Sequence, residues 1–438
     1  MATTTRPRIE RLYWRAGFGA LPAELNTYSR LGVSAAVQNM LRPSGAQLRP
    51  TRAATVGGRP IDPFNEWGHD VLWWLDRAVR GRHQLVERMT LNWHDHFAVS
   101  NDKVGNNRWM VGHYWALRRY ALGSFRALMH TMLRDRAMQM FLDLANSNKA
   151  DPNENFAREL LELYTLGVNN GYTERDIREA ARALTGFTFD WGTKRFGWDP
   201  AAHDTGVKRI FGRRGNFGPA DVVNLAIAHP RHARYLCLKL WGYFTPLPCP
   251  AATLKRMIAT YRISKTRVGP VIQIILGSPE IYANLGEPDM VKPPFVYTAG
   301  MLRKTNQGVH VLAWRWLLDG MGQVPFYPPN VSGWDQNEAW MTTGAIQARF
   351  DGAGQVIDGM RIKDGSIAKT QTPAMAYRSA VAATGRPWMS PISQAAAARY
   401  AKSVPARHPN PWEVSHYWPE RQRVLRHVML AGPDAQVC

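Results

Sequence analysis

Residues 153–167 have the sequence NENFARELLELYTLG, and this stretch decides which fold we expect. Its apolar positions and its last glycine recur at the spacing of one helical face: Phe156, Leu160, Leu163, Tyr164 and Gly167. A glycine also suits the position just after a helix end, where a left-handed backbone is common. The stretch therefore predicts an amphipathic helix that packs its apolar face against a core.

The polar positions of this helix leave two interpretations open. Glu154, Arg158 and Glu162 are spaced by four residues, which suits an ion ladder on an outer stripe. The same groups would also suit an active centre, with Asn155 and Arg158 binding a substrate. Glu159 lies close to the apolar face and off the ladder, so the fold explains it least. We therefore take Glu159 as a candidate catalytic residue.

A second helix is predicted directly after this one. The segment 169–171 has the sequence NNG, which is a turn signal, and Thr173 with Asp176 is close to a capping box in which Asp replaces Glu. The residues that follow have apolar side chains at helical spacing as far as Gly186. We therefore expect a helical hairpin over residues 154–185.

The rest of the chain shows mostly helical spacing. Residues 187–218 are rich in aromatic residues and glycine, which predicts a small β or loop insertion. Residues 351–410 show weak periodicity and are expected to form a loosely organised appendage. A C-terminal helix within 411–438 is expected to pack back on the main domain. We therefore predict a mainly α fold, a large multi-helix single domain over residues 1–350 with these additions.

Charge and composition narrow the class of protein. The 438 residues carry a formal net charge of +21 and include 17 tryptophans. Such distributed positive charge favours an anionic or polyanionic partner, although an arginine-rich, solvated surface fits as well. The three cysteines form no CxxC pair, so neither a zinc knuckle nor a disulfide framework is indicated.

The sequence shows neither a clear membrane-spanning segment nor a clear signal peptide. No apolar run reaches the roughly 18 residues that suggest a membrane span. The residues after Met1 include no apolar signal segment. A cytoplasmic location is therefore expected, or export if a leader was removed.

A first candidate for chemistry outside the 153–167 helix is WHDHF at residues 93–97. His94 and His96 could bind a divalent metal together with Glu154, since imidazole and carboxylate groups are common metal ligands. Two residues that are two positions apart on a helix diverge by roughly 200°, so only an unwound helix end would let both chelate. The alternative is one buried, hydrogen-bonded histidine and one exposed histidine.

A second candidate is the group His203, Asp204 and Lys208, followed by a glycine-punctuated basic loop at 212–218. These three side chains can supply a general base, the group that orients it, and a cation for a developing anion. We therefore take all three as candidate catalytic residues. The alternative is a polar surface loop with a basic edge.

Residues 322–343 are rich in proline, glycine and tryptophan and predict an unusually long loop. Loops of that length in a compact chain are usually functional or act as structural clamps. We therefore expect Trp334 and Trp340 to form a substrate-binding wall beside the other candidates.

Taken in order, several of these motifs resemble one family. They are RLYWRAGFG from Arg11, WHDHF at 93–97, the 153–167 stretch, GYTERDI from Gly171, His203-Asp204 with Lys208, and PPNVSGW at 328–334. Together they resemble the bacterial domain-of-unknown-function family number 1800 over nearly the whole chain. The resemblance implies a protein that is often exported and encoded beside a sulfatase-like partner family. Asp95 stands where asparagine is common in that family.

These observations lead to two expectations about function. The first is a metal- or anion-assisted enzyme whose His, carboxylate, Arg and Lys groups form one pocket for an anionic substrate. The second is a non-catalytic, basic, tryptophan-rich binding or scaffold protein for a polyanion or a partner protein. Convergence of the candidate residues in the fold would favour the first.

Overall fold

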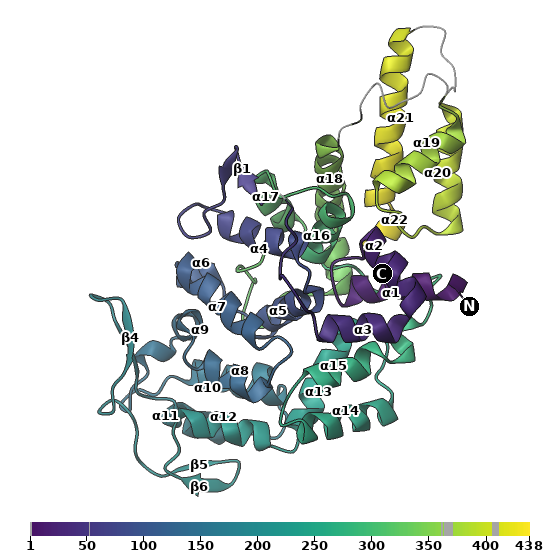
Figure 1. Cartoon of the computed structure of the whole chain (residues 1–438). Helices are drawn as coiled ribbons and strands as arrows, with labels where there is room; N and C mark the ends of the chain where they lie inside the picture. Colours follow the sequence, from purple (N-terminus) through teal and green to yellow (C-terminus); the bar gives the residue numbers. More distant parts are fainter. Residues whose placement is uncertain (1, 52, 361, 363–370, 405–410) are drawn as a thin grey trace.

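The computed structural model describes residues 2–51, 53–360, 362, 371–404 and 411–438, and Figure 1 shows their arrangement. The fold is mainly helical, as the sequence predicts. The helices of the first half are α1 (Ala2–Arg15), α2 (Pro22–Leu31), α3 (Val33–Leu41), α4 (His69–Arg80), α5 (Gln84–His96), α6 (Asn101–Val104), α7 (Asn107–Arg119), α8 (Phe125–Met132), α9 (Arg136–Phe141), η1 (Leu144–Asn146), α10 (Glu154–Glu159), η2 (Leu160–Leu166) and α11 (Glu174–Ala183). Those of the second half are α12 (Pro219–Ala228), α13 (His232–Phe244), α14 (Ala251–Ile263), α15 (Gly269–Leu276), η3 (Pro279–Tyr282), α16 (Pro294–Lys304), α17 (Ala313–Gly320), η4 (Asn337–Met341), α18 (Thr343–Gly359), α19 (Pro373–Ala383), α20 (Pro391–Ser403), α21 (Pro411–Ala431) and α22 (Pro433–Gln436).

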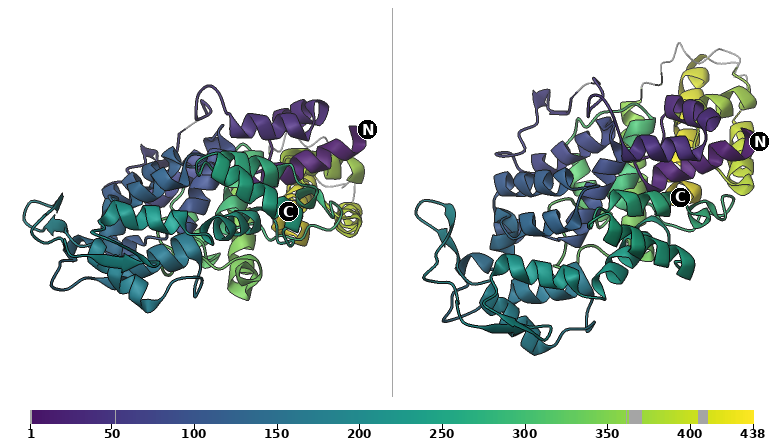
Figure 2. Two further views of the ribbon diagram at one scale, coloured as in Figure 1. Left: turned by 90° about the horizontal axis from the view of Figure 1, so that it is seen from below. Right: turned by 60° about the horizontal axis from the view of Figure 1, so that its bottom comes forward.

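Three antiparallel two-stranded sheets complete the described structure. They are β1 (Thr55–Val56) with β2 (Arg59–Pro60), β3 (Phe187–Asp190) with β4 (Arg195–Trp198), and β5 (Lys208–Ile210) with β6 (Arg213–Gly215). The second and third sheets confirm the β insertion predicted for residues 187–218. Both hairpins lie at the end of the molecule that is remote from α19–α22, as Figures 1 and 2 show.

The predicted helical hairpin over 154–185 is present as α10, η2 and α11. Phe156, Leu160 and Tyr164 are buried, as their spacing predicts. Thr173 closes a capping box at the start of α11, because its hydroxyl accepts the Asp176 N–H while the Asp176 carboxylate accepts the Thr173 N–H. These local signals lie within single turns of helix, which is why the sequence alone is sufficient to predict them.

The second half of the first helix departs from the prediction, because Leu160–Leu166 is a π-helix. The last carbonyl groups of η2, like those of any helix end, need partners outside the helix. His96 Nε2 donates to Tyr164 O at 3.2 Å, His232 Nδ1 donates to Thr165 O at 2.8 Å, and Tyr235 Oη donates to Leu163 O at 2.7 Å. The π-turn therefore ties η2 to α5 and α13.

The C-terminal helices form a small unit with a core of its own, drawn in yellow at one end of Figure 1. Its buried positions are largely alanines on α19 and α20, which pack against α21. Small side chains give little hydrophobic contrast, so helical spacing is weak in the sequence there. Residues 373–383 and 391–403 are thus helices within the region expected to be loosely organised, while 363–370 and 405–410 lie outside the described residues.

Several arginines are buried and join distant parts of the chain. Arg15 of α1 donates to Phe244 O at 3.2 Å and to Cys438 O at 3.1 Å, and it pairs with Asp289. Arg303 of α16 donates to three backbone carbonyls and pairs with a glutamate. Part of the positive charge of this chain is therefore structural and does not contribute to a surface field.

Neither a disulfide bond nor a membrane-spanning helix occurs in the described part of the chain. Cys237, Cys249 and Cys438 are free thiols. Burial raises the pKa of Cys237 to about 12, so this thiol stays protonated and unreactive at neutral pH. Among the described helices, none combines the length and the apolar character that a bilayer crossing requires.

Candidate functional site

A small cavity lies against α5 and brings together polar groups from distant segments. Arg88, Leu91 and Asp95 line it from α5, because positions separated by three and then four residues share one helical face. Tyr243 of α13, Met290, Pro293, Gln323, Gln336 and Trp340 complete the lining. We refer to it as the Asp95 cavity.

Arg88 is the principal cation of this cavity. Its side chain is fully buried, yet its Nε and Nη1 atoms have no hydrogen-bond partner in the described chain. The guanidinium carbon lies 4.9 Å from the centre of the Tyr243 ring, and the Tyr243 hydroxyl donates to Arg88 O at 3.1 Å. A buried guanidinium with unused N–H groups is costly unless an anion reaches it.

Asp95 supplies the carboxylate of the cavity and also fastens the long loop. Its Oδ1 accepts the Trp334 N–H at 2.8 Å, and its Oδ2 lies 3.4 Å from Gln336 Nε2. Gly333 has φ +90° and packs so closely on Asp95 that a Cβ there would collide with the carboxylate and the backbone carbonyl. The loop with the PPNVSGW sequence can therefore pack against Asp95 only because residue 333 is a glycine.

Burial shifts the pKa values of two neighbouring ionisable groups, Asp95 and Lys239, away from their usual values. Burial raises the pKa of Asp95 to about 6, and the Trp334 N–H and the Lys239 charge offset only part of this rise. Burial likewise lowers the pKa of Lys239, which the Asp95 charge opposes. Such opposite displacements of a carboxyl and an amine place both closer to neutral pH, where proton transfer is most effective.

The side chains of His94 and His96 point in different directions, as expected for residues two positions apart on a helix. The Nε2 atom of His94 accepts the Phe326 N–H at 3.0 Å, which leaves the proton of the neutral ring on Nδ1. That Nδ1 has no partner among the described residues. Burial lowers the pKa of His94 well below its usual value, and His113, 5.7 Å away between ring centres, lowers it further. With both nitrogens so assigned, neither presents a lone pair to a metal.

His96 points in another direction and is held by η2. Its Nε2 donates to Tyr164 O, and its ring packs among Phe97, Phe125 and Tyr164. Both histidines of the motif are therefore buried, and not one alone.

The expected metal site is not assembled in the described chain. No group of three or more His, Cys, Asp or Glu side chains there could hold a metal ion. His94 and His96 have the partners given above, and Glu154 pairs with Arg158 at 3.1 Å. The three predicted ligands thus serve separate contacts, and the structure gives no support to a divalent metal at these positions.

The ion ladder of the 153–167 helix is present and lies near the surface. Arg158 pairs with Glu154, with Glu162 at 3.4 Å and with Glu174 of α11 at 2.8 Å. Its guanidinium is therefore shared by three carboxylates, which leaves little of it for an anionic substrate. The pairs join α10 and η2 to α11.

Asn155 and Glu159 flank this ladder. Asn155 Nδ2 donates to Asp143 Oδ2 at 3.4 Å. Glu159 is half-buried, and burial, followed by the charge of Glu162, raises the pKa of its carboxyl. Its environment favours the protonated form, but the described contacts bring no second predicted catalytic group to it.

His203, Asp204 and Lys208 form a local network that fixes the hairpin of β5 and β6. Arg182 of α11 donates to Asp204 Oδ2 at 2.7 Å. His203 Nδ1 donates to Thr185 O at 2.8 Å, and Lys208 donates to Asp204 O. Burial lowers the pKa of Lys208. These contacts are separate from those of Asp95, so the predicted single pocket is spread over several networks.

Trp334 and Trp340, the two predicted substrate-binding tryptophans, have different surroundings. Trp340 is buried and lines the Asp95 cavity, as a substrate-binding wall would. Trp334 is also buried, but its ring lies 5.4 Å from that of His94 and its Nε1 has no partner in the described chain. The loop that carries both tryptophans therefore forms part of this site.

The sequence predicted no functional role for Arg88, Lys239 or Tyr243. The signal for Arg88 was its spacing of seven residues from Asp95, which places both on one face of a predicted helix. No comparable signal exists for Lys239 and Tyr243, because α13 reaches α5 only in the folded chain.

Comparison with known proteins gives one match. A family model described as "Protein of unknown function (DUF1800)" matches residues 11–437. No curated protein and no solved structure matches the chain. The fold and the Asp95 cavity therefore have to be interpreted from the chemistry of this chain.

Proposed function

The chain belongs to the DUF1800 family, whose members have no assigned function, and we propose that it is an enzyme that binds a small anion in the Asp95 cavity and transfers a proton to or from it. In this proposal Arg88 attracts the anion, and Asp95, whose charge interacts with that of Lys239, is the proton donor or acceptor. Trp340 and Tyr243 form the walls. No metal takes part in the proposal.

The observation that carries the proposal is the unsatisfied guanidinium of Arg88. Two of its nitrogen atoms have no hydrogen-bond partner among the described residues, although the side chain is completely buried. Native structures rarely leave buried donors unpaired, so an unpaired one indicates a missing ligand, ion or water. A planar fork of N–H groups is the preferred partner of carboxylate, phosphate and sulfate.

Asp95 adds chemistry that a neutral amide at this position would lack. With a pKa of about 6, its carboxyl exchanges its proton within the range of physiological pH. An asparagine could still accept the Trp334 N–H and seat the loop, but it could not transfer a proton. The proton-transfer step is therefore a proposal for this chain and its aspartate.

Anion binding is tested with inorganic phosphate and sulfate by isothermal titration calorimetry. We expect both anions to bind wild-type protein and to bind Arg88→Met at least tenfold more weakly, since a hydrogen bond to a charged group contributes about 1.5–3 kcal/mol. Arg256→Met, which removes an exposed arginine on α14, is the matched control for net charge. Equal affinity in wild type and Arg88→Met would contradict the proposal.

Proton transfer is tested separately with two anionic esters, p-nitrophenyl phosphate and p-nitrophenyl sulfate. Asp95→Asn should abolish any hydrolysis that wild type shows while leaving phosphate binding intact. Hydrolysis that survives Asp95→Asn at the wild-type rate would remove Asp95 from the mechanism. Phosphate binding without turnover of any ester would favour a binding protein over an enzyme.

A second candidate function, binding of a polyanion, is favoured by one exposed surface. Trp67 and Trp316 are 52% and 60% exposed, and their ring centres are 4.7 Å apart. Arg315 lies 5.5 Å from the Trp67 ring. Exposed aromatic rings in contact with each other and beside a cation suit an extended anionic polymer. Affinity for dextran sulfate should fall steeply with salt and fall further in Trp316→Ala; indifference to both would oppose this function.

A further inference from the structure

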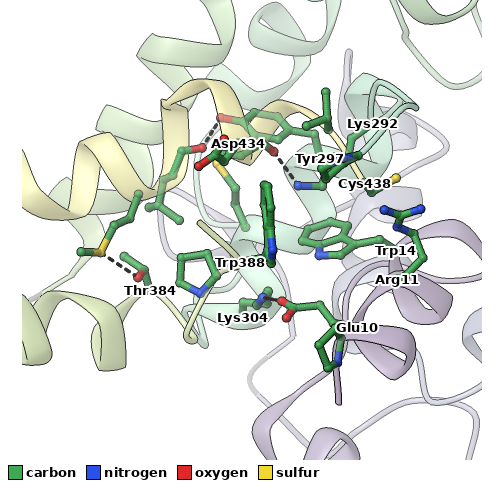
Figure 3. A pocket seen from close by; sticks show the side chains of 18 of the residues that line it. Glu10, Arg11, Trp14, Lys292, Tyr297, Lys304, Thr384, Trp388, Asp434 and Cys438 are labelled. Atoms are coloured by element: carbon green, nitrogen blue, oxygen red, sulfur yellow. Dashed lines mark hydrogen bonds and ion pairs between the residues drawn. The ribbon is translucent and has the colours of Figure 1, made fainter. Parts of the chain in front are cut away.

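A second cavity lies where the C-terminal helical unit meets α1 and α16. Its volume, counted as space for the centres of water-sized spheres, is about 70 Å³. Its lining comes from segments that are far apart in the sequence: α1, residues 285–304, and residues 384–388 with 429–438. We refer to it as the Trp14 cavity; Figure 3 shows its side chains.

Two tryptophans dominate the interior of this cavity. Trp14 of α1 and Trp388, which precedes α20, both project into it, as Figure 3 shows. Trp14 is flanked by two lysines: Lys292 Nζ lies 4.2 Å and Lys304 Nζ 5.5 Å from its ring centre. The cavity therefore combines broad aromatic faces with positive charge.

Most charged groups of the lining already have protein partners. Lys304 pairs with Glu10 at 2.9 Å, and the Asp434 carboxylate accepts the Ser390 N–H at 2.7 Å. Arg11 donates to two backbone carbonyls at 3.0 Å each. These groups are satisfied without a ligand.

Lys292 is the exception. Its side chain is buried, and its amine donates to Ala435 O at 2.6 Å. An ammonium group has three donors, and no carboxylate of the described chain lies within ion-pair distance of this one. Burial accordingly lowers the pKa of Lys292 to about 7. An anion entering the cavity would supply the missing acceptor and favour the charged amine.

We propose that the Trp14 cavity binds a small organic monoanion with a flat apolar body, its anionic group at Lys292 and its body against Trp14 and Trp388. The Lys292 amine, which has a carbonyl partner but no carboxylate partner among the described residues, fixes the charge of the ligand, and the aromatic faces fix its shape. This site is separate from the Asp95 cavity. Residues 290–293 run between the two, since Met290 and Pro293 line one and Lys292 lines the other.

The test uses 2-naphthoate and its neutral analogue 2-naphthamide as probes, with binding measured by calorimetry on the full chain. We expect wild type to bind 2-naphthoate, and Lys292→Met to bind it at least tenfold more weakly. Methionine retains the apolar stem and removes a buried charge, so this variant should fold. The affinity for 2-naphthamide should be the same in wild type and Lys292→Met.

Two further variants complete the design. Trp388→Ala should weaken both probes, because each uses the same aromatic wall. Lys255→Met, which removes an exposed lysine on α14, should change neither. Failure of wild type to bind 2-naphthoate, or equal binding of it by wild type and Lys292→Met, would overturn the proposal.

Discussion

Replacing Asp95 by asparagine is expected to stabilise the protein, and to do so more strongly as pH rises. Asparagine retains an oxygen that can accept the Trp334 N–H, so the loop contact at 2.8 Å can persist. What the substitution removes is a carboxylate whose charged form is disfavoured by burial. The neutral amide resembles the protonated carboxyl in shape and charge.

The magnitude follows from the pKa of Asp95 in the two states. The pKa rises from its ordinary value of 3.8 to about 6 on folding, so the folded state binds the proton more tightly. Stability therefore falls as pH rises from 3.8 to about 6, and the full penalty is present above that range. At 1.36 kcal/mol per pKa unit, the penalty is about 3 kcal/mol at pH 7.5 and about 1 kcal/mol at pH 4.5.

The assay is urea unfolding of wild type and Asp95→Asn at these two pH values, followed by circular dichroism and by tryptophan fluorescence to check that the transitions coincide. The stability advantage of the variant should grow by about 2 kcal/mol between pH 4.5 and pH 7.5. An advantage that does not grow with pH would refute the reasoning, because Asp95 would then titrate with an ordinary pKa. A carboxylate kept at such a stability cost would be understandable as a functional group.

Three further substitutions test contacts in the loop at Asp95 and in the α10–α11 hairpin. Gly333→Ala should destabilise the protein by about 2 kcal/mol or more in urea unfolding, because the backbone there has φ +90° and no space for a Cβ, whereas exposed Ser332→Ala should be neutral. Arg158→Met should change the free energy of unfolding by less than about 1 kcal/mol and lose even this effect in high salt, since its ion pairs lie near the surface; a larger, salt-independent loss would contradict that view. Thr173→Ala should cost about 1 kcal/mol through the lost helix cap, and an unchanged midpoint would show that Asp176 caps the helix without it.

Features within one or two turns of helix could be predicted from the sequence. The apolar face of residues 153–167, the ladder around Arg158 and the capping box at Thr173 depend on spacings of three and four residues. The aromatic and glycine-rich composition of 187–218 was likewise sufficient to predict the small sheets. These features are local, so composition and spacing determine them.

Features that depend on partners elsewhere could not be predicted in this way. The π-turn of η2 is stabilised by His96, His232 and Tyr235, which approach it only after folding. The Asp95 cavity combines α5 with α13 and the long loop, and no spacing in the sequence relates them. Nearness of polar residues along the chain, as in 203–208, indicated a stable hairpin network and not a shared pocket.

The clamp made by Arg15 has a consequence for the order in which the chain folds. Arg15 lies on α1, but its partners are at Phe244, Asp289 and Cys438, between 229 and 423 residues further along the chain. The guanidinium gains its partners only after these distant segments have packed together, and contacts of such long range form slowly. We therefore expect α1 to dock late in folding.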